Sequence, residues 1–367
     1  MMHLLETERR ALLATGRRPF ETCHASTVVA LPGGRRLVAF FAGQREAAGD
    51  TAIWLCHGGP SGWEAPERCF AEAGQPHWNP VLHAEGDEIW LFYKVGASVH
   101  EWTTRIARSR DGGRSWTSPR ALVPGDPAPR GPVKNKLIVL SDGAWLAPGS
   151  VEDDRAWDAF TDRSVDGGIN WERSDVPLTH RSGRSDTGEP WEGLAADALW
   201  ETDPARVFGW DGVIQPTLWE SAPGSVHMLL RSTRGRVYRS DSRDGGRSWA
   251  PAYKTALPNN NSGLDLARLP DGRLLLAYNP VEGNWGRRTP LSLVGSADQG
   301  QTWQPVLQLE TGPGEFSYPA IVAADDTLHL TYTANRTDII YRRFLVSDAS
   351  PGTVEAGIPA SGTADNQ

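Results

Sequence analysis

The sequence predicts an all-β fold, a six-bladed propeller built from small antiparallel sheets around a common axis. The octapeptide from Ser109 to Trp116 recurs letter for letter from Ser242 to Trp249. Related octapeptides begin at Ser164 and Ser296, so the pattern Ser-x-Asp-x-Gly-x-x-Trp stands four times, roughly 55 to 80 residues apart. No stretch shows sustained helical periodicity, and turn-forming glycine and proline occur throughout. These observations indicate one β-sheet unit that is repeated along the chain.

Each copy of the octapeptide is typical of a tight hairpin turn. The aspartate bonds to amides of its own turn, the glycine supplies a positive φ, and the tryptophan fills the gap between neighbouring sheets. A degenerate copy runs from Cys56 to Trp63, where the tryptophan remains and the aspartate is absent. Because each turn is flanked by strand-like segments, we expect six blades that start near His24, Trp78, Pro132, Gly212, Ser262 and Phe316.

A single propeller domain is expected over residues 1–347. The last blade, around Leu328 and Ile339, has few strands of its own, so the N-terminal residues are expected to pair with it and close the ring. The interval between the second and third turns is long, and its surplus at about 174–210 is expected to be an inserted loop. Residues 348–367 are expected to form a flexible C-terminal tail.

Composition excludes several classes of function. The net charge of −8 argues against nucleic acid as a partner. The N-terminus lacks an apolar secretory core and no segment is long enough to span a membrane, so a cytoplasmic location without membrane contact is expected. Three cysteines are too few for a disulfide scaffold. Histidine and cysteine residues lack the spacing of metal ligands, so neither a metal nor another cofactor is expected.

Functional residues are expected on the face opposite to the repeated turns. In a propeller, the connections into the inner strands surround the mouth of the central channel on that face. Cationic, amide and aromatic side chains gather at these positions, and the planar fork of arginine suits a carboxylate. The sequence therefore predicts a pocket for a hydroxyl-rich, anionic carbohydrate. In chain order, its candidate residues are His24, Arg45, Asp50, Asn79, Lys94, Lys134, Lys136, Gln215, Arg231, Arg236, Asn261, Asp265, Arg287, Arg288 and Tyr318.

From about Phe20 to Arg343 the chain resembles the sialidase superfamily, whose Asp boxes, also called BNR repeats, match the four turns. The segments Asn259–Asp265 and Glu315–Ile321 resemble a sialidase-like subgroup found in bacteria and plants. Sialidases hold the substrate carboxylate with three arginines, donate a proton from an aspartate, and use a tyrosine nucleophile that a glutamate activates. The resemblance implies that Asp50 donates the proton. It also implies that Arg231, with Arg287 or Arg288, binds the carboxylate.

Three positions depart from that family pattern. His24 stands where the first arginine is expected, Gln215 where the glutamate is expected, and Phe316 where the tyrosine is expected. Glutamine carries no charge and accepts no proton, so it cannot activate a phenol as a carboxylate does. Because a shift of two residues keeps the same face of a strand, Tyr318 can replace Phe316 after a local change of register.

Three functions are compatible with such a pocket, and we favour the first. An exo-acting glycoside hydrolase would cleave a terminal acidic or acid-linked sugar, with Asp50 as the acid and Tyr318 or water as the nucleophile. A lyase or rhamnosidase-like enzyme would cleave a rhamnose–glucuronate linkage, with His24 as the base and Tyr318 protonating the leaving group. A propeller without catalysis would only bind carbohydrate.

Overall fold

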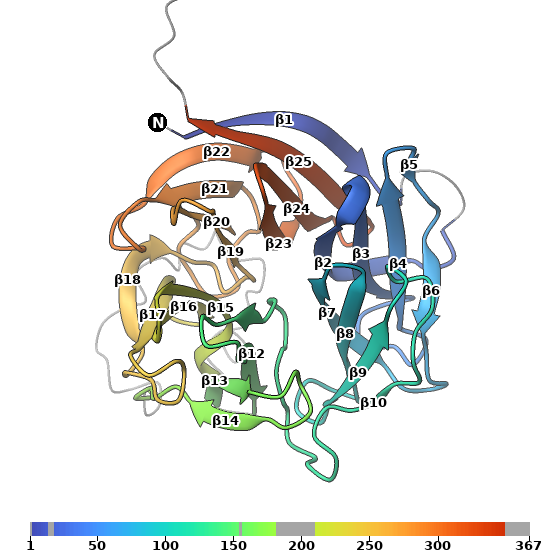
Figure 1. Ribbon diagram of the computed structural model, residues 1–367, viewed down its shortest axis with the longest axis horizontal. Helices are drawn as coiled ribbons and strands as arrows, with labels where there is room; N and C mark the ends of the chain where they lie inside the picture. The colour runs from blue at the N-terminus through green and yellow to red at the C-terminus, as the bar shows by residue number, and fades with distance from the viewer. Residues whose placement is uncertain (1, 14–17, 154–155, 181–209, 349–367) are drawn as a thin grey trace, which may run out of the picture.

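A computed structural model describes residues 2–13, 18–153, 156–180 and 210–348 of the chain. Most of the insertion expected at 174–210, and all but the first residue of the tail expected at 348–367, lie outside the described residues. Over the described residues the protein is an all-β propeller, as predicted, with its sheets arranged radially around a common axis (Figure 1). One 3-10 turn, at Pro32–Gly34, is the only helical element among them.

The strands are grouped into five hydrogen-bonded sheets. The first sheet holds β2 (Thr22–Leu31), β3 (Arg35–Gly43), β4 (Ala52–Gly59), β5 (Gly62–Trp63) and β6 (Glu67–Phe70). The second sheet holds β7 (His77–Glu85), β8 (Glu88–Val95), β9 (Thr103–Ser109) and β10 (Arg120–Ala121). The fourth sheet holds β19 (Asp265–Arg268), β20 (Leu274–Tyr278), β21 (Leu291–Ser296) and β22 (Gln304–Glu310).

The third sheet is larger, with eight strands. It holds β11 (Ile138–Val139), β12 (Trp145–Glu152), β13 (Ala156–Ser164), β14 (Glu172–Asp175), β15 (Asp211–Ala222), β16 (Ser225–Ser232), β17 (Arg236–Ser242) and β18 (Tyr253–Pro258). A short parallel pairing joins β13 to β15, with Ala156 opposite Asp211 and Trp157 opposite Gly212. All other pairings in this sheet are antiparallel.

The fifth sheet combines the two ends of the described chain. It holds β23 (Phe316–Ala324), β24 (Thr327–Ala334), β25 (Asp338–Asp348) and the N-terminal strand β1 (Met2–Ala11). As predicted, the N-terminal residues pair with the last C-terminal strand, from Met2 opposite Asp348 to Ala11 opposite Ile340. Figure 1 shows β1 running along the outer edge of this sheet, beside β25.

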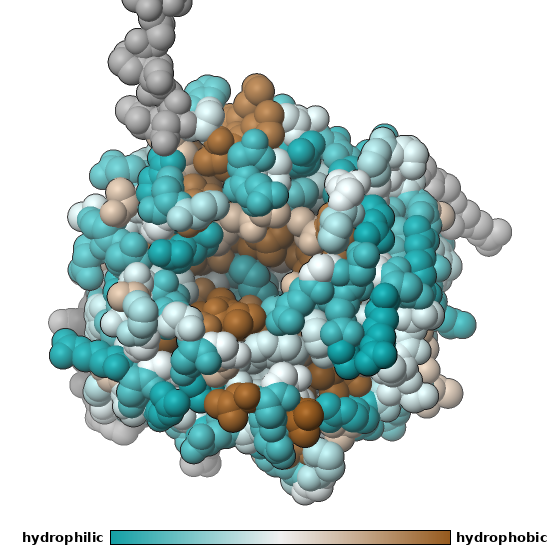
Figure 2. All heavy atoms as spheres, viewed as in Figure 1, coloured by the Kyte–Doolittle hydropathy of each residue, from teal (hydrophilic) through white to brown (hydrophobic). Residues whose placement is uncertain are grey.

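The hydrophobic core lies between neighbouring sheets, because both faces of the middle strands are buried. In β8, Ile89 and Leu91 pack into the cluster shared with the first sheet, whereas Trp90 and Phe92 pack into the cluster shared with the third. This alternation follows from the two-residue period of a strand. A further cluster joins Tyr341 of the fifth sheet to residues of the first sheet. On the face shown in Figure 2 the centre of the molecule is hollowed, with hydrophobic residues in the walls.

The four repeated turns have one hydrogen-bond pattern. In the first, the Asp111 carboxylate accepts bonds from the amides of Arg114 (3.0 Å) and Ser115 (2.9 Å) and from the Ser115 hydroxyl (2.6 Å). The Gly113 amide donates to the Ser109 hydroxyl at 2.8 Å. The same aspartate bonds recur at Asp166, Asp244 and Asp298. The turns therefore stabilise the scaffold, as their sequence predicted.

Gly113 illustrates why glycine is required in these turns. Its φ is +89°, and a Cβ at this position would lie 2.6 Å from Cδ2 of Leu37 in the first sheet. Both the backbone conformation and the close approach of the neighbouring sheet exclude a side chain.

Among the described residues there is no helix with the length and apolarity needed to cross a membrane. All three cysteines, Cys23, Cys56 and Cys69, are free thiols.

Candidate functional site

Four of the strands nearest the axis carry a β-bulge at the same point. The pairing register shifts between His24 and Thr27 in β2, Trp78 and Val81 in β7, Ile214 and Thr217 in β15, and Ser317 and Ala320 in β23. The residue in the bulge has a positive φ, which is 52° at Ala25, 29° at Asn79, 53° at Gln215 and 55° at Tyr318. A bulge re-aims the side chain that it carries.

Proline follows the bulged residue in three of these strands, as Pro80, Pro216 and Pro319. Proline has no N–H to donate, so the hydrogen-bond ladder is interrupted at that point. Asn79, Gln215 and Tyr318 all line one pocket of about 330 Å³. This volume lies near the lower end of the range for ligand sites, roughly 300–1,000 Å³. The remaining lining residues are Glu46, Trp78, Val99, His100, Trp102, Glu152, Trp157, Trp210, Arg231, Trp285, Arg288 and Arg336.

Arg231, near the end of β16, is a buried cation whose hydrogen-bond partners are neutral. Its side chain donates to Asn261 Oδ1 (2.9 Å), Gln215 Oε1 (3.1 Å) and Tyr318 Oη (2.6 Å). The residue is 3% exposed, and within the described parts of the chain no carboxylate lies at ion-pair distance from it. A buried charge without a counter-ion is costly, so the environment of Arg231 is unusual for an arginine.

Two further arginines that line the pocket share an acidic partner. Arg288 Nη1 and Arg336 Nε both donate to Glu315 Oε1, at 2.7 and 2.8 Å. Arg336 Nη1 also donates to Glu46 Oε2 at 2.5 Å. Three guanidinium groups therefore converge on the pocket, from β16, the loop before β21 and the turn between β24 and β25.

Tyr318 lies among the cationic groups. Its ring centre is 5.7 Å from the Arg231 guanidinium carbon, 5.5 Å from that of Arg288 and 5.8 Å from Lys134 Nζ. Phe316, where the family pattern has tyrosine, packs against Tyr332 and does not line the pocket. The bulge in β23 thus provides the change of register that brings Tyr318 to the site.

His24 lies against Tyr318 and outside the pocket lining. Its ring centre is 4.2 Å from that of Tyr318, and its Nδ1 is 3.0 Å from Thr333 Oγ1. The residue is 2% exposed, and Nε2 is buried without a partner. Burial holds the pKa of His24 well below its usual value, and Arg336 and Arg288 act in the same direction. A neutral His24 therefore packs against the ring of Tyr318 and does not itself line the pocket.

Glu152, the last residue of β12, is a pocket residue that the sequence analysis missed. Burial raises the pKa of its carboxyl to about 7, and the Glu46 charge adds to this while Arg231 and His100 oppose it. The His100 Nδ1 atom lies 2.5 Å from the backbone oxygen of Glu152. A carboxyl group in this state is able to donate a proton near neutral pH.

Tryptophan side chains form the apolar walls. Trp157, Trp210 and Trp285 contact one another with ring centres 6.0 to 6.3 Å apart. Trp78 and Trp102 form an edge-to-face pair at 5.7 Å. Flat aromatic faces beside cationic and amide groups suit a sugar ring, which has apolar C–H faces and polar edges.

The predicted proton donor, Asp50, is not part of this site. It is exposed in the β3–β4 loop, and its Oδ2 accepts the Gln44 amide at 3.0 Å. Arg45 is exposed in the same loop and does not line the pocket. From the same loop, a different residue, Glu46, lines the pocket and bonds to Arg336.

Four of the predicted sugar-binding residues do not line the pocket, and three of them, Lys94, Lys134 and Asp265, are buried. Lys94 donates to Thr104 Oγ1 (2.6 Å) and Lys134 to Asn135 Oδ1 (2.9 Å). Lys136 pairs with both Asp265 oxygens at 2.9 Å. Burial lowers the pKa of Lys94 and of Lys134 to about 7. These groups bond to other residues of the protein, and none of them lines the pocket.

Two predicted arginines lie away from the pocket, and one asparagine has an indirect role. Arg236 pairs with Glu282 at 2.5 Å, and Arg287 is exposed next to the buried Arg288. Asn261 does not line the pocket, but its Oδ1 holds Arg231 in place. Of the two alternatives given for the third arginine, the pocket contains Arg288.

The missed residues Glu46, Glu152, Arg336 and the tryptophans come from strand ends and loops without a repeated pattern. One signal was available in the sequence. Asn79, Gln215 and Tyr318 all stand in the first half of an inner strand, and each is followed by proline. That recurrence marks three bulges, and hence the rim on which the site lies.

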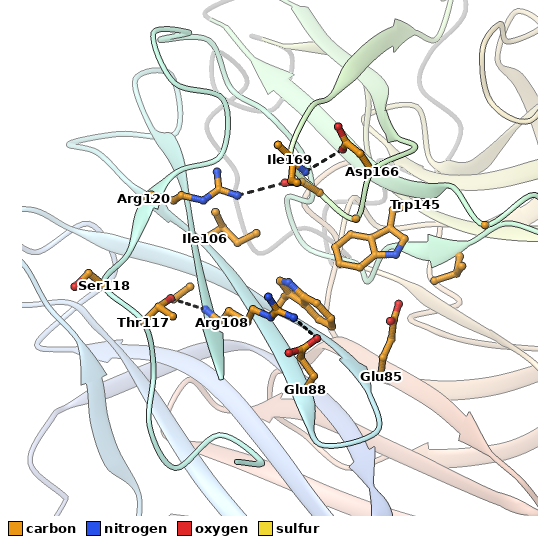
Figure 3. A pocket seen from close by; sticks show the side chains of 16 residues that line it. Glu85, Glu88, Ile106, Arg108, Thr117, Ser118, Arg120, Trp145, Asp166 and Ile169 are labelled. Atoms are coloured by element: carbon orange, nitrogen blue, oxygen red, sulfur yellow. Dashed lines mark hydrogen bonds and ion pairs between the residues drawn. The ribbon is translucent and has the colours of Figure 1, made fainter. Parts of the chain in front are cut away.

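A larger hollow of about 720 Å³ lies between the second and third sheets (Figure 3). Its charged groups are already engaged, since Arg108 pairs with Glu88 and Arg120 donates to the Gly168 backbone oxygen at 3.4 Å. Trp90 and Trp145, which also line it, are largely buried in the core between the sheets. We therefore place the candidate site at the smaller pocket, where charged and polar groups converge. Among the described residues, no cluster of three acidic, histidine or cysteine residues could hold a metal ion.

Comparison with known proteins agrees with this architecture. The family described as BNR repeat-like domain matches residues 34–330. No curated protein matches the chain by sequence. The fold is similar to that of a protein of unknown function from Dyadobacter fermentans (TM-score 0.69, 16% identity), with 94% of this chain and 99% of that chain covered.

Two sialidases also share the fold. The Trypanosoma rangeli sialidase in complex with the inhibitor DANA gives a TM-score of 0.65 at 14% identity, over 93% of this chain and 59% of that chain. The NanB sialidase from Streptococcus pneumoniae gives 0.64 at 10% identity, over 92% and 70%. This chain therefore spans less than two thirds of the length of the Trypanosoma enzyme. The chain belongs to the family of BNR repeat-like domains, and its fold is that of the sialidase-superfamily propellers.

Proposed function

We propose that the protein is an exo-acting glycoside hydrolase that removes a terminal, carboxylate-bearing sugar from a glycan. The observation that carries this proposal is Arg231, a buried cation in the pocket wall whose hydrogen-bond partners among the described residues are all neutral. A sugar carboxylate would supply the missing negative charge through charge-assisted hydrogen bonds.

The replacement at Gln215 explains why Arg231 has no counter-ion. Its Oε1 lies 3.1 Å from Arg231 Nη1, so a glutamate there would form an ion pair with the arginine. The neutral amide holds the guanidinium in position and leaves its charge for a ligand. The same replacement removes the base that would activate Tyr318, so a water molecule is the better nucleophile in this site.

The pocket also holds acid–base groups. Glu46 and Glu152 both line it, from the β3–β4 loop and the end of β12. Two carboxyl groups beside the scissile bond are what most glycoside hydrolases require. The small volume favours a single terminal sugar residue and hence exo action.

The structural relatives support the substrate class. One solved form of the Trypanosoma rangeli sialidase is a complex with sialic acid, a sugar with a carboxylate. At 16% identity this likeness concerns the fold, so the identity of the acidic sugar rests on the pocket of the present chain.

We also infer six blades in a closed ring over residues 1–347. The eight-stranded sheet divides at the β13–β15 contact into two antiparallel units of four strands, β11–β14 and β15–β18. The cluster between Tyr341 and the first sheet, together with the pairing of β1 and β25, supports closure.

A second candidate, a sugar-binding propeller without catalysis, is favoured by one observation, the glutamine at position 215. The lyase or rhamnosidase-like alternative needs His24 to reach the substrate, and His24 lies behind Tyr318.

The test uses the purified full chain with sialyl-, glucuronyl- and rhamnosyl-terminated oligosaccharides. Hydrolysis predicts release of an acidic monosaccharide without absorbance near 235 nm, where an unsaturated uronate absorbs. A rise in absorbance would show that the protein cleaves by elimination and not by hydrolysis. Binding of an oligosaccharide without any product would show that the protein is a non-catalytic sugar-binding propeller.

A further inference from the structure

The two carboxyl groups of the pocket lie in different surroundings. Glu46 Oε2 accepts a hydrogen bond from Arg336 Nη1 at 2.5 Å, and its side chain is 45% exposed. This arginine holds the Glu46 carboxylate at the pocket, where it remains accessible to water. Glu46 is therefore suited to accept a proton.

Glu152 has no such partner. Within the described parts of the chain, no hydrogen bond or ion pair to its carboxyl group is found. The side chain is only partly accessible, in a pocket walled by tryptophans. The charged groups that face it are Arg231, His100 and Glu46. Because burial disfavours the charged form, the pKa of Glu152 is raised to about 7 and the neutral acid is present near neutral pH.

We propose that Glu152 is the proton donor to the leaving oxygen, which places the general acid on β12 and not in the β3–β4 loop. This inference deepens the proposed function and rests on it. Two carboxyl groups that line one pocket, one paired with an arginine and one in apolar surroundings, are suited to act as the base and the acid of a glycosidase.

The chemical step balances with these two groups and one water. The proton of the Glu152 carboxyl moves to the glycosidic oxygen while the bond between that oxygen and the anomeric carbon breaks. The water oxygen forms the new bond to the anomeric carbon, and its proton passes to the Glu46 carboxylate. Exchange with solvent then returns the proton to Glu152 and removes it from Glu46.

The test compares two aglycones on the acidic sugar that the wild-type protein cleaves. A 4-nitrophenyl glycoside leaves without needing a proton, whereas a methyl glycoside needs one. Glu152→Gln should lower kcat/KM for the methyl glycoside by roughly 10²–10⁴-fold and that for the nitrophenyl glycoside by less than about 10-fold. Glu101→Gln, which alters an exposed carboxylate nearby, is the matched control and should leave both values unchanged.

The pH profile is a second signature. An acid must be protonated to act, so wild-type kcat/KM on the methyl glycoside should fall as the pH rises through about 7. The residual activity of Glu152→Gln on the same methyl glycoside should lack this decline. If Glu152 had only a structural role, the loss of activity in Glu152→Gln would be the same for both aglycones, and the decline of kcat/KM at high pH would remain.

Other results would overturn the inference while the proposed function stands. These are an equal loss on both aglycones in Glu152→Gln, or an aglycone-dependent loss in Glu46→Gln or Asp50→Asn. If the wild-type protein cleaves no acidic glycoside, the function itself fails and this inference with it. A readout independent of activity is a carbon-13 carboxyl titration. It should show one glutamate with a midpoint near 7 that disappears in Glu152→Gln.

Discussion

The face with the repeated turns and the pocket at the mouth of the propeller differ in how they use charge. In the turns, each aspartate is exposed and its bonds to neighbouring amides and hydroxyls hold it ionised. Hydrogen bonds from Thr302 lower the pKa of Asp298 to about 2, and bonds from Asn170 lower that of Asp166 to about 2. In the pocket, Arg231 is buried among neutral partners, and burial raises the pKa of Glu152.

This difference in the use of charge indicates that the turn residues mainly serve stability and the pocket residues mainly serve function. The turn groups are fully satisfied and contribute to folding, whereas the pocket groups are incompletely satisfied and therefore costly. A substitution in the turns should lower stability and leave catalysis unchanged. A substitution in the pocket should lower catalysis and leave stability unchanged or higher.

The largest effect is expected for Trp249→Ala in the third turn. Trp249 is 6% exposed and its Nε1 donates to Thr161 Oγ1 at 2.9 Å. It therefore connects the turn after β17 to strand β13. Removing a buried aromatic side chain costs roughly 3–5 kcal/mol. Urea unfolding measures this loss. Trp303→Ala, at the half-buried tryptophan of the fourth turn, should cost less, and equal losses would contradict the difference in packing.

Next in size is Arg231→Gln in the pocket. Two charge-assisted hydrogen bonds to a substrate carboxylate would be lost, so kcat/KM should fall by at least about 100-fold. The melting temperature should not fall, because the unpaired buried charge is removed. Arg247→Gln, at an exposed arginine of a turn, is the control. If kcat/KM of Arg231→Gln stayed within a few-fold of wild type, Arg231 would not be the residue that binds the substrate carboxylate.

A smaller effect is expected for Tyr318→Phe. The variant loses the bond from Arg231 Nη1 to Oη but keeps the ring that packs against His24. If water is the nucleophile, kcat should fall by only about 10-fold, which corresponds to one hydrogen bond. A loss of 1,000-fold or more, on the order expected when a nucleophile is removed, would assign that role to Tyr318.

The smallest effect is expected for Asp298→Ala. Since the pKa of Asp298 is depressed to about 2, its contribution is present above pH 4 and is lost as the pH falls from about 4 to 2. After allowance for solvent screening at this exposed site, the contribution is on the order of 1 kcal/mol. Unfolding should show a smaller difference from wild type at pH 2.5 than at pH 7, with kcat/KM unchanged.

The sequence was most informative where the chain repeats itself. The recurrence of the octapeptide at Ser109 and Ser242 predicted the turns, because the turn bonds are local and depend on residues at fixed offsets. The pairing of N- and C-terminal strands was also predicted, because the last blade lacked strands of its own.

The pocket was only partly predictable because its residues meet through tertiary structure. Gln215, Arg231, Arg288 and Tyr318 were predicted from their positions at the ends of inner strands, and the resemblance to sialidases suggested their roles. Glu152 and Arg336 stand in segments with no pattern, and only the arrangement of the blades brings them together. The sequence also does not tell whether a lysine bonds to a ligand or to backbone oxygens, and Lys134 donates to those of Leu264 and Pro319.

Calorimetry measures whether Arg231 recognises the carboxylate of the sugar. The ligands are the cleaved acidic sugar and its neutral methyl ester, each titrated into wild-type protein and into Arg231→Gln. Esterification should weaken binding to wild type by about 100-fold or more and have little effect in the variant, because the carboxylate and the guanidinium act as a pair. Equal affinity of wild type for the acid and the ester would contradict it.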